Sequence, residues 1–175
     1  MEVISEISIA QLELVVKSIS NISDVQVEGD SVLFKFKDKD SDLMLVIANE
    51  VDDEKLVAMM PLKMSENHVI GCLVSANNWN QRRDSHDTFS YMTSINNDPF
   101  IIIESHLLLR GGVTQDNVRA WIKNLINHIN PFEEQILSNI SEIGEDNDLL
   151  KNSSDNIWAA ITEITTTVIN TWFRS

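Results

Sequence analysis

The sequence predicts an α+β fold built from antiparallel strand hairpins and helices. Three observations predict it. Apolar residues recur at helical spacing near both ends of the chain and in its middle; short segments rich in β-branched and aromatic residues lie between them; and turn residues divide these segments into hairpins. A chain of 175 residues with 43% hydrophobic residues can bury one core of this kind.

The N-terminal third of the chain predicts one helix and four strands. Residues 7–19 should form the first helix, because their apolar residues recur at helical spacing. A hairpin is predicted over residues 25–37, with its turn at Gly29-Asp30 and an alternating second strand that meets water on one face. The strands at residues 43–48 and 55–62 are almost continuously apolar, which predicts cover on both of their faces.

The middle of the chain predicts a second helix and a second hairpin. Ser65 is the predicted N-cap of the second helix. One apolar stripe should mark the inner face of this helix, formed by Val69, Cys72, Leu73, Ala76 and Trp79. Strands at residues 87–93 and 100–107 should then pair, because the Asn-Asn-Asp-Pro segment at 96–99 suits a turn.

A third helix is predicted after the glycine pair. Gly111 and Gly112 supply permissive backbone angles, and Thr114 is the predicted N-cap. Pro131 is expected to end this helix, and a further helical piece should begin after it and run to about residue 143.

The last part of the chain differs from the rest in composition. We predict one α+β domain over residues 1–143, an acidic linker over 144–155 and a C-terminal amphipathic helix over 156–175. This last helix could pack on its own sheet, exchange into a dimer, or capture a partner helix through the face that carries Trp158 and Trp172.

The charge of the chain excludes some classes of partner. Its net charge is −14, from 27 acidic and 13 basic residues, so phosphate backbones and anionic lipids are repelled and we expect no binding to nucleic acid or membrane. No stretch approaches the run of about 20 apolar residues that spans a bilayer. Cys72 is the single cysteine, which fits a reducing compartment and predicts a cytoplasmic protein.

Two motifs suggest metal ligands but are incomplete. His68 and Cys72 lie four residues apart on one predicted helix, yet two ligands are too few for a metal site, and we expect a buried thiol. Asp38, Asp40 and Asp42 imitate the start of a calcium loop, but the loop's glycine at its sixth position and glutamate at its twelfth are missing. We therefore predict no metal, no cofactor and no catalytic residue.

Two segments resemble a known family. NNWNQR at residues 77–82 looks like a helix-ending Trp-Asn segment, and FIIIE at 100–104 through LLLRGGV at 107–113 is similar to an apolar strand with paired glycines before a closing helix. Over about residues 7–137, the chain resembles the YbjN-like family of bacterial sensory-transduction regulators.

This resemblance implies a fold like that of type III secretion chaperones. In that fold a curved antiparallel sheet carries helices on one face, and the other side tends to form dimers. The resemblance also implies regulatory or chaperone-like binding in place of catalysis. It transfers no catalytic or ligand-binding residue to this chain.

The leading hypothesis is a non-enzymatic, homodimeric module that holds an extended or amphipathic segment of a protein partner. Its candidate partner-binding residues are Trp79, Arg82, Arg83, Trp158 and Trp172. The alternative is a small-molecule sensor or unrecognised enzyme with a pocket between sheet and helices, and a third reading is a structural subunit of a larger assembly.

Overall fold

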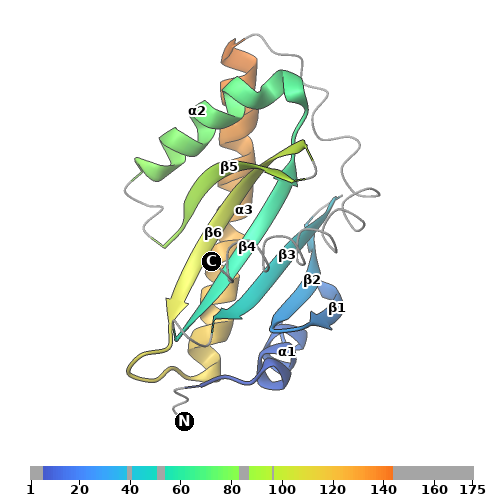
Figure 1. Ribbon diagram of the computed structural model, residues 1–175, viewed down its shortest axis with the longest axis vertical. Coiled ribbons are helices and arrows are strands. Elements are labelled where there is room, and N and C mark those ends of the chain that lie inside the picture. The colour runs from blue at the N-terminus through green and yellow to red at the C-terminus, as the bar shows by residue number, and fades with distance from the viewer. Residues whose placement is uncertain (1–5, 39–40, 51–53, 83–86, 96, 144–175) are drawn as a thin grey trace. The chain divides into compact units, whose positions relative to one another are not determined.

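The computed structural model describes residues 6–38, 41–50, 54–82, 87–95 and 97–143 (Figure 1). The predicted α+β class is confirmed, whereas the predicted linker and C-terminal helix lie outside the described residues. In chain order the elements are α1 (Ile9–Lys17), β1 (Ile22–Glu28), β2 (Ser31–Asp38), β3 (Ser41–Glu50), β4 (Lys55–Lys63), η1 (Glu66–His68), α2 (Val69–Asn80), β5 (Phe89–Ile95), β6 (Asp98–Leu108) and α3 (Gln115–Ile143).

The six strands form one open antiparallel sheet in the order β1-β2-β3-β4-β6-β5. Strands β1, β2 and β3 each pair with the next strand along the chain, and β5 pairs with β6, so both predicted hairpins are confirmed. Because β6 is the neighbour of β4, the second hairpin joins the sheet through its second strand and leaves β5 at the end of the order.

The chain divides into two compact units. Unit 1 comprises Met1–Met60 and Ser105–Leu125, and unit 2 comprises Pro61–Glu104 and Ile126–Ser175. Unit 1 thus holds α1, the first three strands and the start of α3. Unit 2 holds α2, β5 and the second half of α3.

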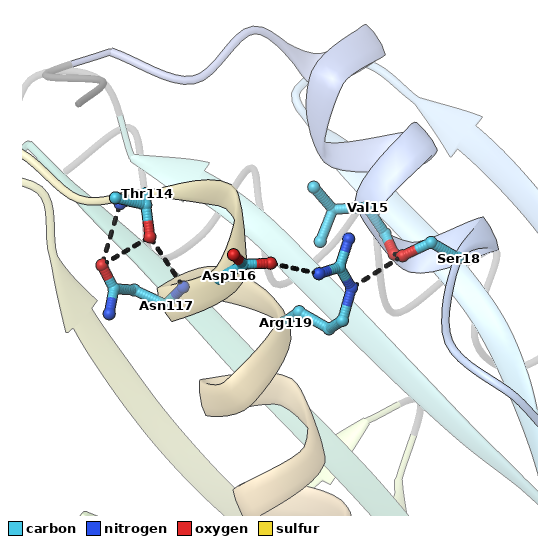
Figure 2. Close-up of polar contacts among 6 residues, drawn as sticks. All are labelled: Val15, Ser18, Thr114, Asp116, Asn117 and Arg119. Carbon is cyan, nitrogen blue, oxygen red and sulfur yellow. Dashed lines mark hydrogen bonds and ion pairs between the residues drawn. The ribbon is translucent and has the colours of Figure 1, made fainter. Parts of the chain in front are cut away.

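In unit 1, α1 packs on β1 and β2 and is tied to the start of α3. Arg119 Nε donates a hydrogen bond to Ser18 Oγ at 3.0 Å, and the Arg119 guanidinium pairs with Asp116 in the first turn of α3 (Figure 2). The Ser18 hydroxyl in turn donates to the Val15 carbonyl at 2.6 Å. One arginine therefore links the end of α1 to the beginning of α3.

Strand β3 is buried on both faces. Leu45 and Ile47 lie on one face and Val46 and Ala48 on the other, and all four side chains are buried. Met59 of β4, directly opposite Val46, is buried as well. The predicted cover on both faces is confirmed. That the C-terminal helix or a second subunit supplies the cover stays a prediction.

Strand β2 departs from the predicted alternation. Val32 and Phe34 are buried as expected, but Leu33 between them is buried too, and only towards Lys37 does a side chain meet water. Leu33 lies opposite Val46 of β3, so it belongs to the second apolar face of the neighbouring strand. The prediction that one whole face of β2 is exposed to water was wrong. The burial of a β2 side chain depends on the side chains beside it on β3 as well as on the alternation within β2.

The start of α3 is built as predicted. Gly111 and Gly112 have φ angles of 86° and 84°, a region that glycine enters without steric penalty. The backbone N–H of Asn117 donates to Thr114 Oγ1 at 3.2 Å, and Asn117 Oδ1 accepts from the Thr114 backbone N–H at 2.9 Å (Figure 2). These reciprocal bonds satisfy two N–H groups that a helix start leaves free.

Pro131 lies inside α3 and does not end it, so the predicted break was wrong. A proline removes one helical hydrogen bond, but the buried stripe of Ile129, Phe132 and Ile136 continues through it at helical spacing. Burial of that stripe outweighs the local loss. Although α3 has 29 residues, no helix in the described ranges has an apolar stretch long enough to cross a membrane.

Candidate protein-binding surface

Helix α2 begins after a short 3-10 turn that its sequence caps. Ser65 Oγ accepts a hydrogen bond from the backbone N–H of Asn67 at 3.4 Å, which confirms Ser65 as an N-cap, here of η1. Val69 then opens α2, which runs to Asn80. The predicted second helix is therefore confirmed, with its first turn wound more tightly than an α-helix.

The outward side of α2 carries an apolar stripe. Ile70, Leu73 and Val74, which we call the outer face, expose 62%, 51% and 38% of their surfaces. They lie at positions i, i+3 and i+4, so they are neighbours on the helix surface. Helix α2 has no charged residue along its 12 positions, although 23% of the chain is charged. Contiguous exposed apolar side chains are a common feature of interaction surfaces, which makes the outer face the candidate site.

The opposite side of α2 is buried. Its inner face consists of Gly71, Cys72, Ser75, Ala76 and Trp79. The thiol of Cys72 is fully buried, as predicted. A helix that is apolar on both sides has no intrinsic preference for which side turns inward, so specific contacts must decide its rotation.

Hydrogen bonds from α3 are the first contacts that fix the rotation of α2. Gln135 Nε2 donates to the Ser75 carbonyl at 2.8 Å, and Asn139 Nδ2 donates to Ser75 Oγ at 2.9 Å. The Ser75 hydroxyl also donates to the Gly71 carbonyl at 2.8 Å, so the hydroxyl both donates and accepts a hydrogen bond. Because Ser75 and Asn139 are buried, rotation of α2 about its axis would leave unpaired polar groups in the interior.

The C-terminal end of α2 is anchored to β5. Trp79 Nε1 donates to Thr88 Oγ1 at 3.1 Å. The side-chain amide of Asn80 accepts from the Ser90 backbone N–H at 2.7 Å and donates to the Ser90 carbonyl at 2.8 Å. Both backbone groups of Ser90 point away from β6, and the Asn80 amide binds them as a neighbouring strand would.

Aromatic contacts complete the anchor. The Trp79 ring meets Phe132 edge-on at a centroid distance of 5.0 Å and His128 at 6.0 Å. The Arg82 guanidinium lies 4.9 Å from the Trp79 ring centroid, and Arg82 Nη1 donates to Gln135 Oε1 at 3.4 Å. These contacts hold the indole between α2 and α3 and set the rotation that leaves the outer face in solvent.

Strand β5, which receives this anchor, is tied to β6 by a side-chain pair. The Tyr91 hydroxyl donates to Glu104 Oε2 at 2.6 Å. Burial raises the pKa of Tyr91 well above its ordinary value, and the hydrogen bond to Glu104 and its charge act in the same direction. The phenol therefore stays neutral and keeps donating at physiological pH.

The described architecture has a counterpart among solved structures. The crystal structure of YbjN from E. coli, provisionally assigned there as a transcription regulator, matches with a TM-score of 0.52 and 15% sequence identity. The match covers 82% of this chain and 95% of YbjN. The chain has the fold of YbjN. No family model and no curated protein matches the sequence.

The YbjN fold confirms the structural part of the predicted resemblance. At 15% identity the likeness shows the fold alone. In this chain the Trp-Asn segment has a structural role, because Trp79 and Asn80 hydrogen-bond the end of α2 to Thr88 and Ser90.

The candidate partner-binding residues lie in different settings. Trp79 is only 1% exposed, so its ring supports the surface from beneath and is not accessible to a partner in this conformation. Arg82 is half-buried over that ring. Arg83, Trp158 and Trp172 lie outside the described residues, and their proposed roles stay predictions.

Sequence reasoning missed the outer face. Leu73 was predicted on the inner stripe and is half-exposed, while Ile70 and Val74 were not singled out. A signal was present, since a 12-residue segment with no charge and apolar residues on every side cannot be explained by one inner stripe. In the part of the chain that the structure describes, no group of three or more His, Cys, Asp or Glu residues could hold a metal ion.

Proposed function

We propose that this chain is a non-enzymatic, regulatory or chaperone-like module that binds an amphipathic segment of another protein on the outer face of α2. The observation that carries the proposal is the exposure of Ile70, Leu73 and Val74 on a helix without charges. Amphipathic helices are recognised by apolar stripes with this spacing, which supply most of the contact free energy.

The charge of the chain supports the choice of a protein partner. With a net charge of −14, direct contact with nucleic acid is disfavoured, so a regulatory role of the kind assigned to YbjN would act here through protein contacts. The same charge favours partner segments with basic flanks, which would be steered towards the chain before apolar contact forms. The proposal places this module in the cytoplasm.

A homodimer is part of the same proposal. What suggests it is the nearly continuous apolar sequence of residues 43–48 and 55–62, which calls for cover on both faces of the sheet. Sedimentation equilibrium at micromolar concentration tests it, and a 19.8 kDa species alone would contradict it.

Site-specific photo-crosslinking tests the binding surface. A photo-crosslinking amino acid is placed at Leu73 in the full chain, the protein is irradiated in cytosol of its source organism, and the products are identified by mass spectrometry. Leu14, which is 67% exposed on α1 in unit 1, provides the matched control. We expect position 73 to give a discrete product with another protein, which is lost when Ile70→Lys is added. Equal products from positions 73 and 14 would contradict the proposal.

A further inference from the structure

The outer face of α2 lies close to the place where the described chain ends. Gln135 and Asn139 of α3 bind Ser75 in the middle of α2, and α3 ends at Ile143, four residues after Asn139. Four residues of helix add about 6 Å. Figure 1 shows this end of α3, in orange, beside α2. The remainder of the chain therefore starts next to α2.

The remaining chain is long enough to reach every part of that face. Residues 144–155 can span at most about 40 Å when extended. Helix α2, with 12 residues, is about 18 Å long. Residues 156–175 can therefore be placed anywhere along α2 without strain in the connection.

The chemistry of residues 156–175 matches that of the outer face. Glu163 and Arg174 are the charged residues of this segment, so it has no net charge. The preceding residues 144–155 carry four acidic side chains, Glu145, Asp146, Asp148 and Asp155, and one basic side chain, Lys151. Residues 144–155 are therefore best solvated, whereas the apolar side chains of residues 156–175 are stabilised by contact with another apolar surface. Its apolar residues recur at helical spacing as Ile157, Ile161, Ile164 and Val168.

We propose that residues 156–175 dock on the outer face of α2 in the same chain and that a partner segment must displace them to bind. The inference rests on the proposed function, because it assigns a competitor to the same face. A connection of this length gives an effective concentration of about 1 mM. Even a contact with a dissociation constant of about 0.1 mM would then be about 90% closed and would weaken partner binding about tenfold.

Fluorine NMR of the full chain tests where this segment lies. The chain has four tryptophans, Trp79, Trp121, Trp158 and Trp172, and 5-fluorotryptophan gives each its own resonance. Cys72, the single cysteine, is replaced by alanine, and a nitroxide is attached to a new cysteine made by Leu73→Cys. The control attaches the same nitroxide through Leu14→Cys. Trp79, on the same helix as position 73, shows that the label is active in each sample whose chain carries both that label and fluorine.

We expect the label at position 73 to broaden the resonances of Trp158 and Trp172, and the label at position 14 to leave them sharp. Adding Ile161→Asp with Ile164→Asp should restore both resonances, whereas Thr162→Asp with Thr166→Asp adds the same charge away from the apolar positions and should not. Broadening of Trp79 without Trp158 and Trp172 would overturn the inference, and so would equal broadening from both label positions.

A mixed sample separates the chain's own segment from that of a second copy. Nitroxide-labelled chain without fluorine is mixed with fluorinated chain without nitroxide. Sharp Trp158 and Trp172 resonances in this mixture support docking within one chain, and broadened resonances overturn it in favour of exchange between copies.

The two proposals fail in different ways. If the fluorine measurement shows no docking but photo-crosslinking at position 73 still captures a partner, the function stands and the competitor does not. If residues 156–175 dock but the Ile161→Asp, Ile164→Asp chain captures no partner at position 73, the outer face serves this segment alone and the proposed function fails.

Discussion

Helices α1 and α2 are both short, but they are held in place by different means. Helix α1 carries its own signals: Ser8 and Gln11 form a capping box, Glu13 and Lys17 pair four residues apart at 2.6 Å, and one apolar stripe is buried. Helix α2 has no charged pair and no side-chain cap of its own. Its place depends on contacts with residues that are distant in sequence, such as Gln135 and Asn139.

The two helices also differ in what they expose. Leu14 is a single exposed apolar residue on α1, and isolated residues of this kind are ordinary on protein surfaces. The outer face of α2 presents three such residues as neighbours. A helix whose rotation is determined by tertiary contacts can hold an apolar face in solvent, since burial of the other face and its polar bonds outweigh the exposure. The proposed function rests on this difference.

The largest expected effect is that of removing the anchor of α2. Trp79→Ala deletes a buried indole, its contact with Phe132 and its hydrogen bond to Thr88. We expect the free energy of unfolding to fall by about 3–5 kcal/mol, measured by urea denaturation. Trp79→Phe, which keeps much of the packing, should lose less. A loss below that of Ser8→Ala would contradict the dependence of α2 on tertiary contacts.

A smaller effect is expected where α2 meets β5. Asn80→Ala leaves the N–H and carbonyl of Ser90 without their side-chain partner, which should lower the free energy of unfolding by about 1–3 kcal/mol. Asn78→Ala is the matched control on the exposed side of the same helix and should change it by less than about 0.5 kcal/mol. Equal losses of unfolding free energy for the two variants in the same denaturation experiment would show that the Asn80 side chain does not stabilise the contact between α2 and β5.

The smallest effect is expected in α1, whose cap acts locally. Ser8→Ala removes the acceptor for the Gln11 backbone N–H and should reduce the free energy of unfolding by about 1 kcal/mol. Ser20→Ala changes an exposed serine beyond the end of α1 and serves as the control. A loss as large as that from Trp79→Ala would show that α1, too, depends mainly on distant contacts.

Local signals allowed much of the fold to be predicted. The cap at Ser65, the glycine pair before Thr114 and both hairpins lie where the sequence places them, because caps, turns and strand alternation depend on residues close along the chain. The candidate surface could be predicted only in part. Trp79 was singled out as a contact but is buried, since a sequence does not show which partners a side chain will meet, whereas partner binding by Arg82, which lies over its ring, stays a prediction.

The sequence by itself determined the α+β class, the order of the elements, the acidic charge and the apolar character of β3 and α2, because all of these follow from composition and local periodicity. Only the tertiary structure decided that α3 continues through Pro131, that Leu33 is buried and that Leu73 faces solvent. Each of these depends on free energy gained between residues far apart in the chain. Burial of the stripe on both sides of Pro131 exceeds the loss of one hydrogen bond, and the bonds of Ser75, Trp79 and Asn80 select one of two apolar sides of α2 to face inward.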